Sequence, residues 1–281
     1  MQPLTFPIPF AKLSGTGNDF IIIDHRQPFI AAEDQAEFAR RVCRRMFSVG
    51  ADGLILIENT ASEDFAWKFY NGDGSVAEMC GNGARCAARF AFLNKIAPAV
   101  MRFQTQAGVI AAEVLPGGEV KIKLTPPAAV KFGQPLYFGG EEREVHSLNT
   151  GVPHVVYLVP EANAVPVVEW GRTVRHHPHF QPAGTNVNFV QVLGADQLLV
   201  RTYERGVEDE TMACGTGAVA AAIVALKQGL VTSPVRVVTS GGEHLRIHLA
   251  AAAPGGAISE VYLEGAAKLI YNGQLSAEAL R

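Results

Sequence analysis

Apolar positions along the chain come in short runs rather than in long helical stripes. Two runs, 20–23 and 155–158, each follow a Thr-Gly pair, and apolar or β-branched residues dominate 51–57 and 185–191. Short runs of this kind, bounded by turn residues, are typical of strands. The same pattern predicts further strands at 120–124, 198–203, 235–239 and 245–249. The chain is therefore expected to be dominated by strands.

Two longer apolar segments have the character of helices. They run from about residue 84 to 95 and from about 218 to 228, and Gly229 follows the second one as a C-terminal stop. Each segment comes directly after a Cys-Gly-x-Gly sequence, at 80–83 and 214–217. We expect one central helix in each half of the chain, with a cysteine just before its start.

The spacing of these two motifs indicates an internal repeat. Cys214 stands 134 residues after Cys80, and at the same offset the Thr-Gly pair at 16–17 falls on the Thr-Gly pair at 150–151. Both Thr-Gly pairs lead into a strand-like run. Several matches at one constant offset favour two homologous halves.

These patterns together predict an α+β fold. We expect two pseudo-symmetric lobes, each a strand-rich sheet wrapped around a central helix, with the active site in the cleft between them. Pro126 and Pro127 mark the linker because consecutive prolines continue neither a ladder nor a helix. The N-terminal lobe is placed at 1–125 plus 266–281, since a strand near 270–275 is expected to complete it, and the C-terminal lobe at 126–265.

Composition and charge narrow the range of functions. The 281 residues carry a formal net charge of −3, which gives no reason to expect nucleic acid or an anionic membrane as a partner. No apolar run has the length of a membrane span, and the opening residues lack the pattern of a signal peptide. We therefore expect a cytoplasmic protein with reduced thiols.

A cysteine just before a helix has a specific chemical potential. Unsatisfied backbone N–H groups and the helix dipole favour negative charge there, so the thiol pKa is expected to fall. The flanking glycines let the same N–H groups approach a carboxylate. Two such thiols could act on opposite faces of one carbon, one removing a proton and the other delivering one. We predict that Cys80 and Cys214 are this acid/base pair, and that Cys43 and Cys86 are bystanders.

Other readings of these motifs were weighed against catalysis. A single buried cysteine in a glycine-rich turn is usually structural, but a matched pair at equivalent repeat positions favours catalysis. Residues 215–220 fit a dinucleotide-binding pattern, yet they follow a charged loop rather than the strand that this motif requires. The histidines at 176, 177 and 179 lie in a polar, proline-containing stretch, where a solvated loop is favoured over a metal site. The four cysteines form no CxxC pair, so no metal is expected.

Four motifs are distinctive when they are taken together. They are Lys-Leu-Ser-Gly-Thr-Gly-Asn-Asp-Phe at 12–20, Met-Cys-Gly-Asn-Gly-Ala-Arg-Cys at 79–86 with Tyr-Asn-Gly-Asp-Gly-Ser before it, Pro-His at 153–154, and 203–218. In order and from about residue 10 to the end, they resemble the motifs of the diaminopimelate epimerases. Proline racemases share the paired cysteines, but they typically have His where Asn82 stands and lack the Tyr-Glu-Arg-Gly sequence at 203–206.

The resemblance implies interconversion of LL-2,6-diaminopimelate and its meso isomer without pyridoxal phosphate or any other cofactor, in the route to lysine and peptidoglycan. It also implies a homodimer with Tyr271 at the contact. Backbone groups of four residues would hold the carboxylate beside the reacting carbon: Gly81, Asn82, Gly215 and Thr216. His154 and Glu204 would support catalysis. Five side chains would bind substrate: Asn18, Asn71, Asn186, Glu204 and Arg205.

The chemistry of the substrate agrees with two of these positions. A zwitterionic group at each end needs both an anion donor and a cation acceptor, and the adjacent Glu204 and Arg205 supply one of each sign. The alternative for this pair is an exposed ion pair on a loop. For Asn18, Asn71 and Asn186 taken singly, a turn or cap role is an equal alternative.

The chain departs from the family pattern at two positions. Gly53 stands where many members have Gln, and Val152 stands where many have Asn, with Asn149 as a nearby substitute. Three other functions stay open. They are a thiol redox protein with a reversible disulfide between Cys80 and Cys214, a non-catalytic amino-acid-binding protein, and a racemase for a cyclic amino acid.

Overall fold

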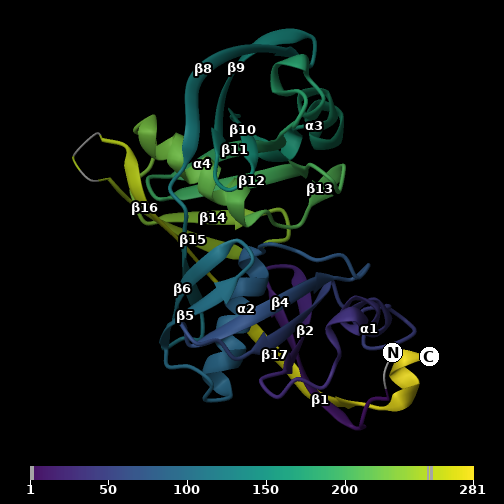
Figure 1. Cartoon of the computed structure of the whole chain (residues 1–281). Coiled ribbons are helices and arrows are strands. Elements are labelled where there is room, and N and C mark those ends of the chain that lie inside the picture. The colour runs from purple at the N-terminus through teal and green to yellow at the C-terminus, as the bar shows by residue number, and fades with distance from the viewer. Residues whose placement is uncertain (1–2, 252, 254–255) are drawn as a thin grey trace. The chain divides into compact units, whose positions relative to one another are not determined.

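The computed structural model describes residues 3–251, 253 and 256–281 (Figure 1). The chain forms two compact units, residues 1–122 with 265–281 and residues 123–264. The linker prolines lie just after the first boundary. Met1 and Gln2, with which the expected N-terminal lobe begins, and residues 252, 254 and 255 of the expected C-terminal lobe lie outside the described residues. Strands dominate and helices are few, which confirms the α+β prediction.

The first unit is built on a continuous ladder of strands. β17 pairs antiparallel with β1, so the C-terminal strand belongs to the same sheet as the N-terminal one. From β1 to β6 the successive pairs are antiparallel, parallel, antiparallel, parallel and antiparallel, and β7 pairs antiparallel with β6. The strands are β1 (Ile8–Gly15), β2 (Asn18–Asp24), β3 (Gly53–Glu58), β4 (Phe65–Asn71), β5 (Val100–Thr105), β6 (Gly108–Val114), β7 (Val120–Leu124) and β17 (Lys268–Leu275).

The second unit repeats this order of directions. The pairs β9–β10, β10–β11, β11–β12, β12–β14 and β14–β15 are antiparallel, parallel, antiparallel, parallel and antiparallel. β8 pairs with β9, and the short β13 pairs with the end of β12. The strands are β8 (Ala128–Phe138), β9 (Glu141–Asn149), β10 (Pro153–Leu158), β11 (Asn186–Gly194), β12 (Gln197–Glu204), β13 (Asp209–Thr211), β14 (Val235–Thr239), β15 (His244–Ala251) and β16 (Ile258–Gly265).

Among the described residues, each unit also carries two α-helices, placed in the connections between its parallel strands. Parallel strands require a crossover, and α1 (Gln35–Val42) and α3 (Val167–Arg175) supply equivalent ones. The sequence pattern treated these two only as intervening segments. Both are short and amphipathic. Phe38 and Val42 on α1, and Val167 and Val174 on α3, are the buried apolar residues that could have indicated them.

The other two helices are the central ones that the sequence predicts. α2 (Gly81–Leu93) and α4 (Gly215–Lys227) each lie among the strands of their own unit (Figure 1). Both begin three residues before the expected start, because the glycines form the first turn once the cysteine acts as N-cap. On α4 every residue from 217 to 225 is buried, and small apolar residues make this burial on all sides feasible. Gly229, with a φ of 72°, ends the helix.

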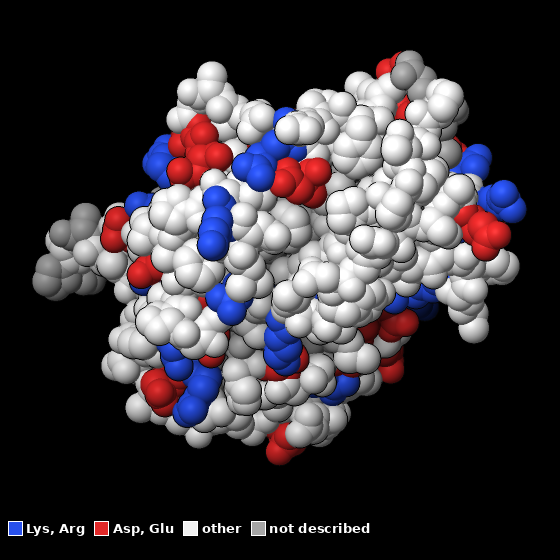
Figure 2. Space-filling view, turned by 90° about the horizontal axis from the view of Figure 1, so that it is seen from below, with Lys and Arg blue, Asp and Glu red and all other residues white. Residues whose placement is uncertain are grey.

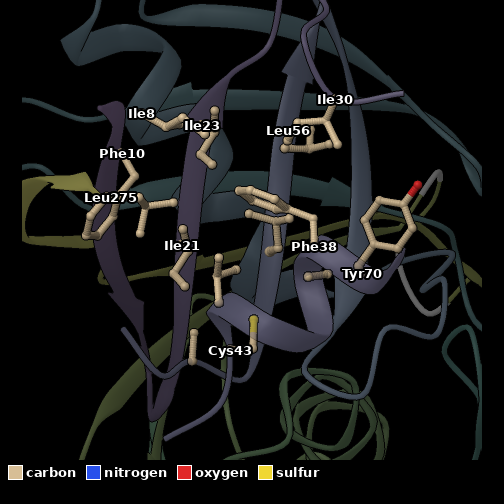
Figure 3. Packing of buried hydrophobic residues seen from close by; sticks show 14 of the residues in the cluster. Ile8, Phe10, Ile21, Ile23, Ile30, Phe38, Cys43, Leu56, Tyr70 and Leu275 are labelled. Carbon is tan, nitrogen blue, oxygen red and sulfur yellow. The ribbon is translucent and has the colours of Figure 1, made fainter. Parts of the chain in front are cut away.

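One apolar core of the first unit lies between α1 and the strands (Figure 3). Ile21 and Ile23 of β2 and Leu56 of β3 face Phe38 of α1 across this core. The sulfur of Cys43 lies in it as well, and burial raises the pKa of this thiol to about 12. Cys43 is therefore a neutral core thiol.

Charges on the face shown in Figure 2 occur in small mixed groups of both signs. Arg45 with Asp19 and Asp52, and Arg40 and Arg41 with Glu37, are ion pairs of this kind. No broad patch of one sign covers that face. Along the described part of the chain, no helix combines the length and the apolar character needed to cross a bilayer.

We expect Phe38→Ala to lower the free energy of unfolding by about 3–5 kcal/mol, because it leaves a cavity between α1 and the strands. Urea unfolding followed by circular dichroism measures this change. Phe47→Ala is the matched control: Phe47 is 72% exposed, so its loss should cost less than about 1 kcal/mol. Equal losses in the two variants would contradict this description of the core.

Candidate active site

Cys80 occupies the N-cap of α2. Its backbone is extended, with φ −148° and ψ 118°, and its Sγ accepts a hydrogen bond from the N–H of Gly83 at 3.5 Å. The side chain is half-buried. Both features follow from the motif, since the cysteine begins the helix and the glycines leave its first N–H groups uncovered. The expected position of this thiol, just before the helix, is confirmed.

A directed chain of hydrogen bonds lies beside Cys80. Arg85 donates to Asn82 Oδ1 at 2.8 Å, Asn82 Nδ2 donates to Asn18 Oδ1 at 2.6 Å, and Asn18 Nδ2 donates to Asp52 Oδ2 at 3.0 Å. The chain starts at a guanidinium, which can only donate, and ends at a carboxylate, which can only accept. The orientation of both amides is therefore fixed. Two predicted site residues, Asn18 and Asn82, are thus bonded directly to each other. The residues at the two ends of the chain, Arg85 and Asp52, were not singled out from the sequence.

Asn71, the third predicted asparagine of this unit, has a local partner. Asn71 stands at the exposed end of β4, and its Nδ2 donates to Ser75 Oγ at 3.0 Å. This is the turn role that was weighed for the asparagines. The departure at Gly53 has a steric reason: a Cβ there would lie 2.6 Å from the ring of Phe69. Asn149, the expected substitute for the other departure, uses its Oδ1 to accept from the N–H of Gly151 at 2.8 Å.

Cys214 occupies the equivalent N-cap of α4, also with an extended backbone. Its Sγ lies 3.5 Å from the hydroxyl oxygen of Thr216. Burial raises the pKa of this thiol to about 12, and the negative charge of Glu204 adds to the rise. The prediction that the helix start lowers the thiol pKa is wrong for Cys214. The backbone N–H groups and the Thr216 hydroxyl do act in that direction, but burial and Glu204 outweigh them.

His154, on β10, stands behind Thr216. Its Nε2 lies 3.0 Å from the Thr216 hydroxyl oxygen, and its ring is almost completely buried. Burial, helped by the positive charge of Arg205, lowers the pKa of His154 to about 3. The imidazole is therefore neutral at physiological pH. The structure connects His154 with Cys214 through Thr216.

Glu204 is the last residue of β12, and Arg205 follows it directly. Burial raises the pKa of Glu204 above its ordinary value. Arg205 donates from its guanidinium to the carbonyl of Ala183 at 2.9 Å. Asn186 accepts from the backbone N–H of Arg205 at 2.8 Å and donates to Pro153 O at 3.3 Å. Asn186 thus fixes the backbone that carries the two charged side chains.

Two further polar residues of this unit were missed from the sequence. Asn188 is fully buried on β11, and its Oδ1 accepts from the hydroxyl of Thr202 at 2.9 Å. A signal for Asn188 was present, because it stands two residues after Asn186, on the same face of an otherwise apolar strand. In the described residues, no group of three or more His, Cys, Asp or Glu side chains is arranged to hold a metal ion.

Solved structures with the same fold define the class of protein. A phenazine biosynthesis protein of the PhzF family from Bacillus anthracis matches with a TM-score of 0.75 at 12% identity, covering 97% of this chain and 100% of that one. A probable proline racemase from Agrobacterium radiobacter K84 matches with a TM-score of 0.68 at 16% identity, covering 96% and 93%. The chain has the two-lobed fold of PhzF proteins and proline racemases.

The sequence comparisons are more specific. The family model of diaminopimelate epimerase matches residues 10–130 and 146–270. The diaminopimelate epimerase of Aquifex aeolicus is 49% identical over 281 residues, covering 96% of this chain and 99% of the relative. That of Archaeoglobus fulgidus is 38% identical over 286 residues, covering 98% of each. The chain belongs to the diaminopimelate epimerase family, and the resemblance seen in its motifs is confirmed.

We expect the ring of His154 to remain neutral from pH 9 down to about pH 4. Its pKa is lowered in the folded state, so the unfolded chain binds this proton first, below about pH 6.5. The contribution of His154 to stability is therefore complete above pH 6.5 and falls by about 1.4 kcal/mol per pH unit below it. Histidine ring NMR against pH, with the urea-unfolded chain as reference, measures the titration. A folded-state midpoint near 6.5 would overturn this assignment.

We expect Glu204→Gln to lower the pKa of the Cys214 thiol, because it removes the carboxylate that opposes the thiolate. At pH 9 the rate at which iodoacetamide alkylates Cys214 should rise, as followed by peptide mass spectrometry. Glu208→Gln is the control, since that exposed carboxylate pairs with Arg175 and His176 instead. An unchanged or slower rate in Glu204→Gln would contradict the expected effect.

Proposed function

We propose that this chain interconverts LL-2,6-diaminopimelate and meso-diaminopimelate, without a cofactor, through a two-cysteine acid/base exchange. The observation that carries the proposal is the repeated placement of a thiol at the N-cap of a buried helix, Cys80 in one unit and Cys214 in the other. The names of the relatives support the substrate, since curated proteins up to 49% identical over nearly the whole chain are diaminopimelate epimerases.

The reaction is a transfer of protons with no net redox change. One cysteine, as thiolate, forms an S–H bond with the α-hydrogen of the substrate, and the electrons of the broken C–H bond pass onto the carbon and its carboxylate. The other cysteine, as thiol, gives its proton to the opposite face of that carbon. The product has the inverted configuration. The proposal requires the substrate to engage both units, so that the two sulfurs reach one carbon from opposite sides.

The state of Cys214 suits the second of these roles. Its pKa of about 12 keeps the thiol protonated, ready to donate. The first-turn N–H groups of α2 and α4, at Gly81, Asn82, Gly215 and Thr216, would hold the carboxylate and stabilise the charge that develops on it.

The remaining predicted residues would recognise the two charged ends of the substrate. Glu204 and Arg205 offer opposite charges on one loop, and Arg205 can hold a carboxylate with two donors. Asn18, with its orientation fixed by Asn82 and Asp52, would offer an amide N–H. Asn71 and Asn186 are kept as substrate-binding candidates, and His154 as a supporting residue.

The family resemblance extends the proposal to assembly and location. We infer a homodimer with Tyr271 at its contact, which is supported by three successive exposed apolar side chains on β17, Leu269, Ile270 and Tyr271. We also infer a cytoplasmic enzyme, because a thiol mechanism fits a reducing compartment.

We expect wild-type enzyme in deuterated buffer with dithiothreitol to place deuterium at the α-carbon of LL-diaminopimelate and to form the meso isomer. Cys80→Ala and Cys214→Ala should each lower turnover by about a thousandfold or more, because each removes a proton carrier from the transition state. Proton NMR and chiral chromatography measure the two products. Cys43→Ala, in the core of the first unit, is the control and should keep its activity.

Near-normal turnover in either variant would sink the two-base mechanism. Proline serves as a parallel substrate, because solved structures that share the fold include a probable proline racemase and a hydroxyproline epimerase. Label in proline alone would keep the paired cysteines but overturn the substrate. Absence of label from both amino acids would favour a redox or binding role.

A further inference from the structure

Asn188 has a defined orientation although it lies outside the predicted site. Its Nδ2 lies 2.8 Å from the carbonyl oxygen of Val155, and its Oδ1 lies 2.9 Å from the hydroxyl of Thr202. A backbone carbonyl can only accept, so the nitrogen of the amide must face Val155. The flipped amide would set two acceptor oxygens against each other in a fully buried place, at a large cost.

This orientation determines which nitrogen of His154 carries the proton. The second hydrogen of Asn188 Nδ2 faces His154 Nδ1 at 3.1 Å. Nδ1 must therefore accept, and in a neutral imidazole the proton then resides on Nε2. His154 is neutral because its burial lowers its pKa to about 3. The tautomer is thus set by a backbone carbonyl, through one amide.

The tautomer in turn directs the hydroxyl of Thr216. His154 Nε2–H points to the Thr216 oxygen at 3.0 Å, so the oxygen accepts there and its own hydrogen is available for another acceptor. Cys214 Sγ lies 3.5 Å from that oxygen. The Thr216 hydroxyl can then donate to the sulfur, which is the interaction that a thiolate needs.

We propose that Asn188 is a positioning residue that fixes the tautomer of His154, so that the Thr216 hydroxyl donates to Cys214 and stabilises the thiolate left when that cysteine gives up its proton. The inference rests on the proposed function of Cys214 as a proton carrier. Asn188 itself touches no reacting atom and acts through two other side chains.

The packing around Asn188 leaves this arrangement little freedom. A Cβ at Gly217 would lie 2.3 Å from Asn188 Oδ1, so the first turn of α4 is packed directly against the amide. The backbone oxygen of Thr216 accepts from the hydroxyl of Thr150 at 3.0 Å, which holds the other side of the same turn. The last glycine of the Cys-Gly-Thr-Gly motif thus has a steric reason tied to Asn188.

The charged and titratable groups near Cys214 within its unit come from three places. Glu204, at the end of β12, raises the thiol pKa, and His154 on β10 is neutral. The positive charge of Arg205, beside Glu204, helps to lower the pKa of His154. None of them donates a hydrogen bond to the sulfur in place of Thr216 among the described contacts.

The test replaces Asn188 by Asp, which removes a donor while keeping the shape. The new carboxyl group is either ionised or protonated, in which case it donates its hydrogen to Val155 O. In both states it accepts from His154 Nδ1, so the ring proton moves to that nitrogen. Nε2 then accepts from Thr216, and Cys214 loses its side-chain donor. We expect iodoacetamide alkylation of Cys214 at pH 9 to slow by about tenfold in Asn188→Asp. The reason is that a rise of about one unit in the thiol pKa lowers the fraction of thiolate about tenfold.

A double-mutant cycle separates this relay from a structural effect. Thr216→Val should slow alkylation by a similar factor, and Asn188→Asp should add nothing further in that background. Thr216→Ser keeps the hydroxyl, so Cys214 should be alkylated in this variant at the wild-type rate. The proposal would be overturned if Asn188→Asp/Thr216→Val slowed alkylation by the product of the factors of the two single variants. An unchanged rate in Asn188→Asp would overturn it as well.

A measurement on the wild-type chain keeps the proposal testable even where Asn188→Asp does not fold. The ¹⁵N chemical shifts of the His154 ring should show Nδ1 as the unprotonated nitrogen and Nε2 as the protonated one; the reverse assignment would overturn the proposal. Neither the shifts nor the alkylation rates involve diaminopimelate. The hydrogen-bond chain from Asn188 to Cys214 can therefore be contradicted while the isotope exchange succeeds. The isotope exchange can likewise fail while this chain is confirmed.

Discussion

The structure of each unit depends on a buried central helix that begins at a cysteine N-cap. The N-terminus of a helix leaves several N–H groups without partners in the helix, and a cysteine at the N-cap faces them. On α4 small apolar side chains, mostly Ala with Val and Ile, allow burial on all sides from residue 217 to 225. α2 also buries larger side chains, Arg85 and Phe90 among them.

Burial raises the pKa of three of the thiols, but the groups that surround these thiols differ. Cys43 and Cys86 lie in apolar cores, and burial raises the pKa of each to about 12. Cys214 reaches the same value, but a hydroxyl and two backbone N–H groups oppose the rise. Its thiolate is therefore unfavourable at rest yet has donors arranged for it. A group that must alternate between thiol and thiolate needs both conditions.

The two halves solve the same structural problem with different side chains. Asn82 and Thr216 each stand two residues after their cysteine. Asn82 lies in a chain of amides between Arg85 and Asp52, whereas Thr216 ends a chain from Asn188 through His154. Both chains have one direction only, because each is anchored by a group that can only donate or only accept. The repeated backbone thus carries two distinct polar networks.

The sequence by itself determined several of the strands, the repeat and the places of Cys80 and Cys214. These rest on local patterns: β-branched runs, glycine stops and a motif repeated at constant spacing. It did not determine the charge state of Cys214, because helix position and burial act in opposite directions and only the packed chain decides between them. Nor did it reveal Arg85, Asp52, Asn188 or Thr202 as partners of site residues. Apart from the contact between Arg85 and Asn82 within α2, their hydrogen bonds join residues far apart in sequence, and only the pairing of strands and the packing of the two central helices bring them together.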